Sequence, residues 1–432
     1  MKLRLAVLTL ILALALSYGG YTFVRQRHAQ ALFQAAEQAA QHYDFLQAHT
    51  LLEQLLQVQP GNARGHLLAA RAIRRGQFDE SFTGPQAGLQ ASAEQHLEQC
   101  RRLKGPVEDI ALESVLLRVQ QGERGNAEKI LIQRVQAKDA DAPLILEALI
   151  YACMSRRQRD RAAYFAEALL SLEPDNVPGL DWRGQVRQAL FFREAALQDL
   201  ERAVELNPDL NMARFHLADI LLAAGNYTEA AVHLEILHGR IPENLWVRLA
   251  WARLQIARAQ TREGCALLDA WLADAPPAHP RRLEALDERA SAALAMAEFA
   301  QVEAFARSAL QISPCDERAL YSLYSSLNSQ GRHEEAGQIQ ARMTQAKKEL
   351  QFLSRAIAQL AASPNDLALR RQIGEAYLRL EIPGEAMAWF NGILDSDPRH
   401  RATLQTLADY FARRGNTDQA AEYRRRLDSA GP

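Results

Sequence analysis

The sequence has little cysteine, and its cysteines are not arranged for a metal or redox site. There are four: Cys100, Cys153, Cys265 and Cys315. Even the closest two, Cys265 and Cys315, are 50 residues apart, so no CxxC pair exists. The first three stand among apolar residues at helical spacing, where a free cysteine packs as a small hydrophobic side chain.

Histidine patterns typical of metal ligands are also missing. The 11 histidines are scattered along the chain. His233 and His238 are five residues apart, which does not place them on one helical face as a spacing of three or four would. We therefore expect no metal and no cofactor.

No catalytic motif occurs in the sequence. It has no GxSxG turn, no glycine-rich phosphate loop and no HExxH zinc motif. Aspartate and glutamate are spread over segments of helical composition, where we expect them on solvated helix faces. The sequence therefore predicts a protein that is not an enzyme.

A strong charge of one sign is absent as well. The chain carries 50 basic and 52 acidic residues, a net charge of −2. Short basic clusters occur, such as Arg281-Arg282 and Arg424-Arg425-Arg426, and we expect them on solvated helix faces. Nucleic acid, which calls for a basic face, is not an expected partner.

What the sequence does contain is a period. Prolines recur at intervals of 34 residues, at Pro174, Pro208, Pro242 and Pro276. Alanine and leucine dominate and β-branched residues are few, which favours helix. A fixed period of 34 is typical of helix–turn–helix units stacked into a solenoid.

Small residues recur with the prolines. Twelve residues before each proline stand Ala162, Ala196, Ala230 and Gly264, and the same pattern returns at Pro398 with Gly374 and Ala386. Two helices that cross closely need small side chains at the crossing point. Glycines lie midway through several units and are expected to end the first helix: Gly76, Gly122, Gly225, Gly331 and Gly415.

With these features the chain resembles the tetratricopeptide repeat (TPR) family, whose repeat has small residues near positions 8 and 20 and proline near position 32. The units around Ala218, Ala230 and Pro242, and around Gly374, Ala386 and Pro398, are similar to that pattern. The resemblance implies an all-α fold: a right-handed α-solenoid of about eleven TPR helix–turn–helix repeats, preceded by one N-terminal hydrophobic helix.

Three segments are expected along the chain. Residues 1–27 form an N-terminal transmembrane anchor or signal peptide, residues 28–428 form the solenoid, and residues 429–432 form a short tail. Within the second repeat, residues 77–90 contain Gly84-Pro85 and Gly88 and are expected to include a surface loop. In the ninth repeat, which continues from Arg332, the stretch from Lys347 to Ser363 contains no Gly or Pro, which predicts either a long second helix or an additional helix.

The N-terminal apolar run has two interpretations. Leu5 to Val24 is 20 residues, enough for one membrane crossing. However, the strongest part, Leu5 to Leu16, is short, and Ala13-Leu14-Ala15 offers a small-x-small cleavage site. We favour an uncleaved single-pass anchor over a cleaved signal peptide that would release a secreted protein.

Charges beside the run predict its orientation. The N-terminal amine, Lys2 and Arg4 precede it, whereas only Arg25 and Arg27 follow it. This excess of positive charge before the run favours an N-terminus inside the cell and repeats on the non-cytoplasmic (periplasmic) side.

The family resemblance also implies a ligand-binding face. In TPR proteins the first helix of each repeat lines the concave face, and aromatic rings among polar groups suit a peptide or helical segment. The corresponding residues are Glu147, Tyr151, Asp181, Gln185, Met212, Phe215, Asp219, Trp246, Arg253 and Tyr321. The alternative is that Phe215 and Trp246 pack between repeats instead of meeting a ligand.

The function that these features favour is binding without catalysis. We expect a membrane-tethered scaffold or adaptor whose partners are other proteins or peptides. Two alternatives stay open: a cytoplasm-facing, membrane-anchored regulator of envelope assembly, and a targeting subunit for a separate enzyme.

Overall fold

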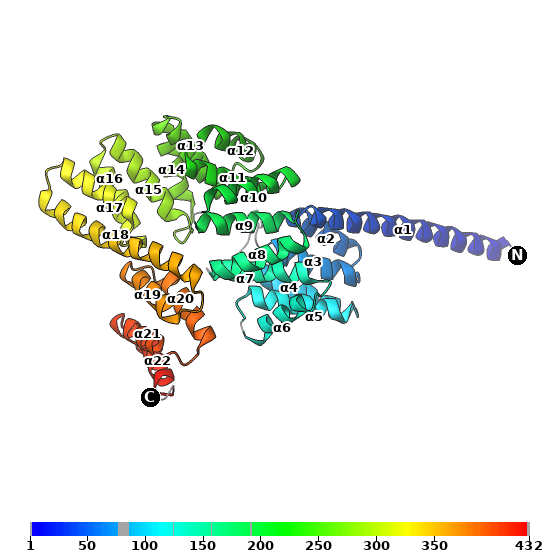
Figure 1. The fold of residues 1–432 in the computed structure, drawn as a ribbon. Helices are drawn as coiled ribbons and strands as arrows, with labels where there is room; N and C mark the ends of the chain where they lie inside the picture. Colours follow the sequence, from blue (N-terminus) through cyan, green and yellow to red (C-terminus); the bar gives the residue numbers. More distant parts are fainter. Residues whose placement is uncertain (1, 77–85, 124, 157, 191, 430–432) are drawn as a thin grey trace. The chain divides into compact units, whose positions relative to one another are not determined.

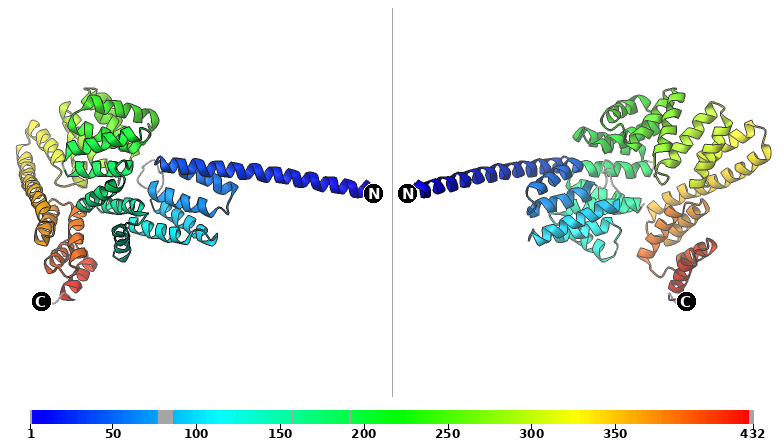
Figure 2. Two further views of the ribbon diagram at one scale, coloured as in Figure 1. Left: turned by 45° about the vertical axis from the view of Figure 1, so that its right-hand side comes forward. Right: turned by 180° about the vertical axis from the view of Figure 1, so that it is seen from behind.

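The computed structural model describes residues 2–76, 86–123, 125–156, 158–190 and 192–429. Over these ranges the chain forms twenty-two helices and no strand (Figure 1). They follow one another as eleven pairs, here called hairpins 1 to 11, and paired helices such as α21 and α22 pack against each other, as Figure 2 shows in red. The all-α class and the number of repeats agree with the prediction.

The first five hairpins are α1 (Lys2–Gln41) with α2 (Phe45–Val58), α3 (Ala63–Gly76) with α4 (Gln86–Arg102), α5 (Val107–Gln120) with α6 (Asn126–Gln136), α7 (Ala142–Ser155) with α8 (Arg159–Leu172), and α9 (Val177–Ala189) with α10 (Arg193–Leu206).

The remaining six are α11 (Asn211–Ala224) with α12 (Tyr227–Arg240), α13 (Leu245–Ala257) with α14 (Thr261–Asp274), α15 (Arg282–Ala295) with α16 (Phe299–Ile312), α17 (Glu317–Ser329) with α18 (His333–Ala362), α19 (Leu367–Arg379) with α20 (Pro383–Ser396), and α21 (Arg401–Arg413) with α22 (Thr417–Ser429).

The turns between hairpins use short polar side chains to start the next helix. The Asn176 side-chain oxygen accepts a hydrogen bond from the Gly179 amide at 2.8 Å, at the start of α9. Asp366 caps α19 in the same way, accepting from the Leu369 amide at 2.9 Å. Each cap satisfies an amide that the helix itself leaves unpaired. The predicted caps after the prolines are confirmed at these positions.

The turns within hairpins need a left-handed residue. Gly225, Gly331 and Gly415 have φ of 81°, 76° and 74°, as a glycine that ends a helix does. Ala297 takes φ of 58° at the equivalent turn of hairpin 8, so glycine is not the only residue used there. Gly76, by contrast, is the last residue of α3 and is buried.

The helices group into two compact units. Unit 1 is Met1–Ser155 with Arg159–Ile220, and unit 2 is Arg156–Gln158 with Leu221–Pro432. The segment 28–428, predicted as one solenoid, is therefore divided between two units, and each is described separately below.

Unit 1 has a core built from successive hairpins. A large cluster joins α5 to α9 through buried residues such as Leu116, Leu131, Leu149 and Leu169. A second cluster joins the C-terminal half of α1 to α2 and α3 through Ala29, Ala36, Leu52 and Ala69, among others. This neighbour-to-neighbour burial is what a repeat architecture requires, because no single hairpin can bury its own apolar face.

Unit 1 also contains contacts that skip several hairpins. Tyr43, in the turn of hairpin 1, packs with Leu170, Val177 and Leu180 of hairpins 4 and 5. The Asn207 side-chain amide, after α10, donates to the His42 carbonyl at 2.8 Å. Hairpin 1 therefore packs against hairpins far along the chain, which a pattern of neighbour contacts does not predict.

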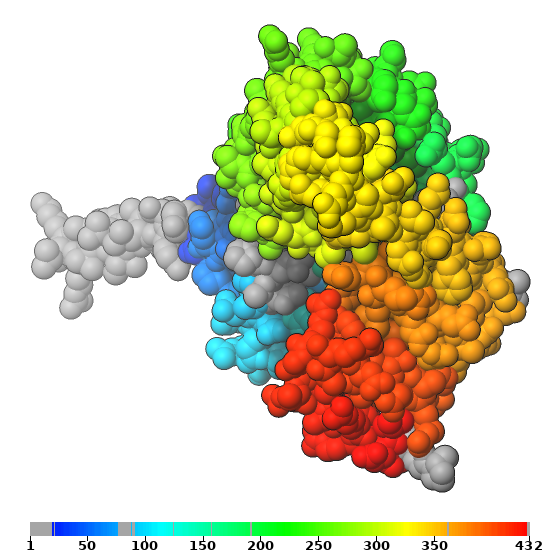
Figure 3. All heavy atoms as spheres, turned by 90° about the vertical axis from the view of Figure 1, so that its left-hand side faces the viewer, coloured from blue at the N-terminus to red at the C-terminus, as the bar shows by residue number. Residues whose placement is uncertain are grey.

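Unit 2 includes one unusually long helix. α18 runs for 30 residues, His333–Ala362, which decides between the two predictions for the ninth repeat. Its first half packs on α17 through Ala336, and its second half packs on α19 through Leu353 and Leu360. Much of its opposite side is exposed, and α18 forms the yellow to orange surface in Figure 3. One helix thus serves as a shared partner for two hairpins.

The N-terminal helix is continuous with the first repeat. α1 spans Lys2–Gln41, so the predicted boundary at residue 27 is not a break in the helix. At Arg25, α1 already contacts the end of α2, because the Arg25 Nε donates to the Val58 carbonyl at 3.0 Å. Side chains 2–19 and 21, which include most of the apolar run, lie outside the described part of the structure. Among the described residues, we find no helix with the length and apolar character to span a membrane.

Two other predictions fall partly on residues outside the described ranges. Residues 77–85 of the predicted surface loop are among them, and α4 already begins at Gln86, before the predicted end of that loop at residue 90. Most of the predicted tail, 430–432, also lies outside, and α22 ends at Ser429.

Candidate functional site

The predicted binding residues of unit 1 lie on the first helices α7, α9 and α11, but three of them are buried. Glu147, Asp181 and Phe215 are 4%, 6% and 2% exposed. Tyr151, Gln185, Met212 and Asp219 are half-buried. The buried three therefore have little surface to offer a ligand, and the alternative interpretation of Phe215 as a packing residue describes its position in the structure.

Glu147 is buried because hairpin 2 covers it. The Arg75 guanidinium on α3 donates two hydrogen bonds to the Glu147 carboxylate, each 2.8 Å long. The same guanidinium lies over the rings of Phe45 and Tyr43, at 4.6 and 5.6 Å from their centroids. A charged pair of this kind, shielded by aromatic rings, fixes α3 against α7. This part of the predicted face is occupied by the chain itself.

Asp181 is held by polar neighbours on two helices. His216 on α11 lies with its Nδ1 2.7 Å from one carboxylate oxygen, and the Gln185 side-chain amide donates to the other at 3.1 Å. The Phe215 ring stands edge-on to His216, with centroids 5.7 Å apart. These contacts make Asp181 and Gln185 part of a network that joins α9 to α11.

Tyr151 keeps some exposed surface. Burial raises the pKa of its hydroxyl, so it is a neutral donor and acceptor at physiological pH. Together with the half-buried Met212 and Asp219, it is what unit 1 retains of the predicted face.

Unit 2 presents a different arrangement, a continuous strip of side chains over α13, α15 and α17. At one end the Arg281 guanidinium lies 5.3 Å from the Trp246 ring centroid and bonds Glu284 at 2.8 Å. Arg253 pairs with the same Glu284 at 2.7 Å. Trp246 and Arg253 are seven residues apart on α13 and so share one side of that helix.

The strip continues from α15 to α17. Arg253 lies 3.5 Å from the Glu288 carboxylate, and Arg318 on α17 reaches the same Glu288 at 3.0 Å. Tyr321 is one turn beyond Arg318 and is 56% exposed. We call this set the polar strip of unit 2; its members are Trp246, Arg253, Arg281, Glu284, Glu288, Arg318 and Tyr321.

Three residues of the polar strip were predicted from sequence: Trp246, Arg253 and Tyr321. Contacts through Arg281 and Glu284 connect Trp246 to Arg253. Glu288 connects Arg253 to Arg318, which is one turn from Tyr321. The others were not identified, because a TPR-type pattern specifies the packing positions and leaves the charges between helices open. The signal for them is the placement of opposite charges across adjacent first helices: Glu284 at position 2 and Glu288 at position 6 face Arg253 at position 9, and Arg318 at position 2 faces Glu288.

A groove lies elsewhere in unit 2, between the second helices α16 and α18. Its volume is about 410 Å³. Its apolar lining comes from Leu310, Leu323, Leu327 and Ile339, and Arg307, Glu335 and Arg342 also line it. No sequence pattern indicates this groove, because it depends on how α16 and the first part of α18 pack on either side of α17.

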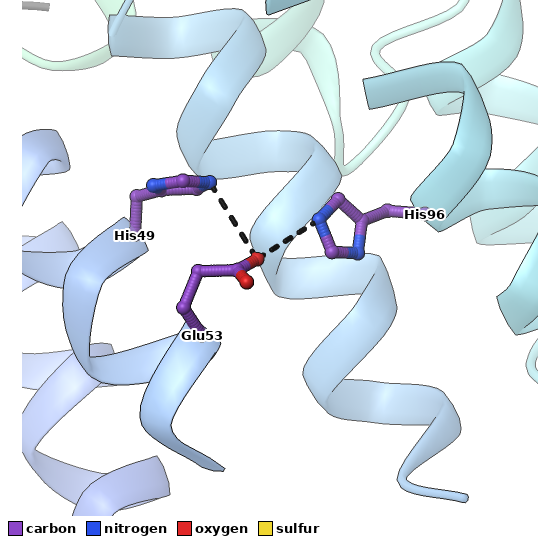
Figure 4. A group of neighbouring side chains, drawn as sticks. All are labelled: His49, Glu53 and His96. Atoms are coloured by element: carbon purple, nitrogen blue, oxygen red, sulfur yellow. Dashed lines mark ion pairs between the residues drawn. The ribbon is translucent and has the colours of Figure 1, made fainter. Parts of the chain in front are cut away.

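One group of side chains in the described part of the structure is arranged as metal ligands are. His49 and Glu53 lie one turn apart on α2, and His96 approaches from α4 (Figure 4). Glu53 Oε1 is 3.8 Å from His49 Nε2 and 3.3 Å from His96 Nε2. Burial lowers the pKa of both histidines, although Glu53 opposes this effect. The expectation of no metal missed this group, since His96 is distant from His49 in sequence and only the pair on α2 has a ligand-like spacing.

Comparisons with known proteins found similar solved structures only. No family model matches the chain, and no curated protein matches it. It is similar to a TPR protein from Parabacteroides merdae, with 15% identity over 70% of this chain and 99% of that one and a TM-score of 0.36. It is also similar to TTC0263, a thermophilic TPR protein of Thermus thermophilus, with 25% identity over 45% of this chain and 95% of that one and a TM-score of 0.30.

A third similar structure is the human IFIT1 dimer with m7Gppp-AAAA, with 15% identity over 85% of this chain and 90% of that one and a TM-score of 0.44. The TPR-like, all-helical fold of this chain rests on its own hairpins, caps and turns as described above.

Proposed function

We propose that this chain is a non-catalytic scaffold that binds a peptide or helical segment of another protein on the polar strip of unit 2. The observation that carries the proposal is that Glu284 and Glu288 on α15 connect Arg253 on α13 to Arg318 on α17. Arg253 is two turns from Trp246, and Arg318 is one turn from Tyr321. A partly exposed ring at each end and charges of both signs between them match the composition of protein-binding surfaces, where aromatic and arginine side chains supply most of the free energy.

The ion pairs of the strip support a role in setting register. Arg253 and Arg318 share the Glu288 carboxylate, so one carboxylate orients two guanidinium groups. A guanidinium that is oriented before the partner arrives lowers the entropic cost of binding. Charges of both signs also select against partners with a run of one charge.

Unit 1 offers less of its first-helix face. Its buried Glu147, Asp181 and Phe215 are in contact with the chain's own side chains. We therefore propose unit 2, and not unit 1, as the main binding unit.

Site-specific photocrosslinking tests this proposal. A photoreactive phenylalanine analogue replaces Tyr321 in the full chain, expressed in its own host. The matched control replaces Tyr164 on the second helix α8, which is 70% exposed and so at least as accessible. A third position, Gln338, monitors the groove between α16 and α18. The expected result is a discrete protein adduct from position 321 and none from position 164.

The partner identified in this way is then measured with purified proteins. Trp246→Ala and Tyr321→Ala should each weaken binding about tenfold or more, as truncation of an aromatic anchor does. Adducts from position 338 alone would move the binding site to the groove. Adducts from neither position, or unchanged affinity in both variants, would reject the polar strip as the binding surface.

We further propose that the apolar run Leu5 to Val24 tethers the protein to a membrane, with the repeats on the non-cytoplasmic side. The support is its length and flanking charges, together with the continuity of α1 from Lys2 to Gln41. A helix that passes without a break into hairpin 1 would hold unit 1 close to the membrane surface, since no linker separates them.

Two measurements test the tether and its orientation. Alkaline extraction of membranes should leave the full-length chain in the pellet, with an intact N-terminus by mass spectrometry; a chain cleaved after Ala15 and found in the soluble fraction would establish the signal-peptide alternative. The second measurement fuses a reporter enzyme after Asp428. If the reporter is one that is active only outside the cytoplasm, the fusion should be active. Activity only of a cytoplasmic reporter would establish the cytoplasm-facing alternative.

A further inference from the structure

We propose that unit 1 binds one divalent transition-metal ion, of the class that zinc represents, through His49, Glu53 and His96. Two imidazoles and one carboxylate form a ligand set that zinc and its neighbours in the periodic table prefer. The ion would join α2 to α4 and so connect hairpins 1 and 2.

The distances fit such an ion. The candidate ligand atoms of the three residues all lie within 4.8 Å of one another. Two ligands of a tetrahedral zinc ion, each about 2.0–2.1 Å from the metal, are roughly 3.3 Å apart. Glu53 Oε1 and His96 Nε2 already have this separation, 3.3 Å. His49 Nε2 is 3.8 Å from the same oxygen, and a small side-chain rotation would bring it into range.

A third histidine, His66, sets the tautomer of His96. The His66 Nε2 lies 3.1 Å from the Pro60 carbonyl, which can only accept a hydrogen bond, so His66 carries its proton there. The His66 Nδ1 of this tautomer is then an acceptor, and it lies 3.0 Å from the His96 Nδ1. With both rings neutral, His96 then donates from Nδ1, which leaves a lone pair on its Nε2.

This relay directs a lone pair of His96 at a carboxylate oxygen. Two electron-rich atoms 3.3 Å apart repel each other unless a cation lies between them. A metal ion supplies that cation, and the chain from Pro60 through His66 to His96 is the type of hydrogen bonding that orients metal-ligating histidines. An additional proton on His96 would relieve the same repulsion. The experiment below distinguishes a bound metal ion from this proton.

The surroundings leave room for exchange with solvent. The Glu53 side chain is 46% exposed, whereas those of His49 and His96 are 24% and 12% exposed. A four-coordinate ion bound by His49, Glu53 and His96 would keep its fourth coordination position for water, as zinc sites with three protein ligands do.

Metal binding is measured with Zn²⁺ alone, in competition with a chromophoric chelator, on the full chain purified in detergent and freed of metal. One Zn²⁺ per chain is expected. Co²⁺ in place of Zn²⁺ should give the intense visible absorption of a tetrahedral site, which a proton cannot produce. Absence of saturable Zn²⁺ binding would overturn the proposal.

Variants locate the site. His49→Ala, His96→Ala and Glu53→Gln should each weaken Zn²⁺ binding at least tenfold and reduce the Co²⁺ absorption. His66→Ala should weaken binding by about 10–100-fold, as loss of a supporting hydrogen bond does. The matched control is His333→Ala, a histidine exposed on α18 of unit 2, which should bind as the wild type does.

Circular dichroism of each variant separates loss of the site from loss of the fold. Because Glu53 is partly exposed and glutamine has nearly the same shape, Glu53→Gln is the variant in which the fold is best preserved. Equal Zn²⁺ affinity in the wild type, Glu53→Gln and His96→Ala would show that the ion binds elsewhere and would overturn the assignment.

Discussion

The side-chain amide of Asn207 donates a hydrogen bond to the main-chain carbonyl of His42, 2.8 Å away, across 165 residues of sequence. It joins the end of α10 to the turn between α1 and α2. Beside it, Tyr43 packs among the apolar residues of hairpins 4 and 5, and Arg75 bonds Glu147. Hairpins 1 and 2 therefore do not only continue the row of repeats; they also cover part of it.

The Tyr43 contact should contribute to the stability of unit 1. Tyr43→Ala removes the ring that packs from the turn of hairpin 1 against α9. We expect the free energy of unfolding to fall by about 2 kcal/mol, somewhat less than for truncation of a fully buried aromatic residue. Hydrogen–deuterium exchange should become faster in α2 and α9 together. Tyr164→Ala, an exposed tyrosine on α8, serves as the control and should leave exchange unchanged. Faster exchange in α2 alone would mean that hairpin 1 is held by its neighbours and not by this closure.

Glu113 on α5 should be the carboxylate on which unit 1 depends most strongly. It is 1% exposed and accepts from Arg74 at 2.7 Å and from Arg71 at 2.5 Å. Glu113→Gln would leave the buried Arg74 guanidinium without its counter-charge, and removing one member of a buried ion pair costs about 3–5 kcal/mol. Urea unfolding followed by circular dichroism measures the change. Glu98→Gln, which breaks a pair with Arg101 and Arg102 on the exposed face of α4, should produce no measurable change.

The same carboxylate should make unit 1 sensitive to acid. Burial raises the pKa of Glu113, but the guanidinium groups of Arg74 and Arg71 outweigh burial and hold the pKa below its ordinary value. A lowered folded-state pKa gives stability that is present above the unfolded-state pKa and is lost as the pH falls through the folded-state value. The loss of stability in acid should therefore be smaller in Glu113→Gln than in the wild type. An identical slope in both chains would contradict this account.

Asp287 should have the opposite pH dependence in unit 2. It is buried on α15 with one carboxylate oxygen unpaired, and burial, with Asp316 nearby, raises its pKa to about 8. A raised folded-state pKa gives stability that is complete below about pH 4 and is lost as the pH rises toward 8. Asp287→Asn should therefore match the wild type below about pH 4 and exceed it increasingly as the pH rises, by at least about 1 kcal/mol at pH 8, the equivalent of roughly one pKa unit.

The measurement is the urea midpoint of both chains across this pH range. Asp274→Asn, an exposed carboxylate on α14 that pairs with Arg248, is the control and should not reproduce the effect. Parallel profiles for the wild type and Asp287→Asn would show that Asp287 is ionised in the folded protein.

The sequence could predict what repeats within the chain and could not predict what occurs once. Prolines at a fixed interval, polar caps such as Asn176 and left-handed glycines such as Gly225 are local requirements of each hairpin, so their spacing determines the helix bounds. The approach of His96 to His49 depends on how α4 packs relative to α2 across a neighbouring hairpin. The closure between Asn207 and His42 depends on how the small rotations between several hairpins add up. Such sums are not encoded in any one segment, and a pattern search over single repeats misses them.

The same reasoning explains the outcome for the predicted binding residues. The repeat position selects residues on one side of each first helix, because position within the repeat sets direction. It did not reveal that Arg75 covers Glu147, whereas Tyr321 stays exposed. Exposure depends on the side chains that a distant hairpin places over that side, and these are specific to this chain.

The close crossing of paired helices gives a prediction that separates packing from helix propensity. In hairpin 10, a Cβ added to Gly374 would lie 2.6 Å from a ring carbon of Phe390, which is fully buried and cannot move aside. Gly374→Ala should therefore destabilise unit 2 by about 1–2 kcal/mol, because overpacking outweighs the roughly 1 kcal/mol that alanine gains over glycine in a helix.

The matched control lies in the same hairpin. A Cβ at Gly392, within α20, would meet nothing closer than the Arg370 guanidinium at 3.8 Å. Gly392→Ala should therefore stabilise unit 2 by about 0.5–1 kcal/mol through backbone entropy alone. The free energies of unfolding of the two variants should change with opposite signs in urea titrations. If both substitutions stabilised the protein, the helices of hairpin 10 would have to cross farther apart than Gly374 and Phe390 indicate, and the requirement for small residues at the crossing would not hold there.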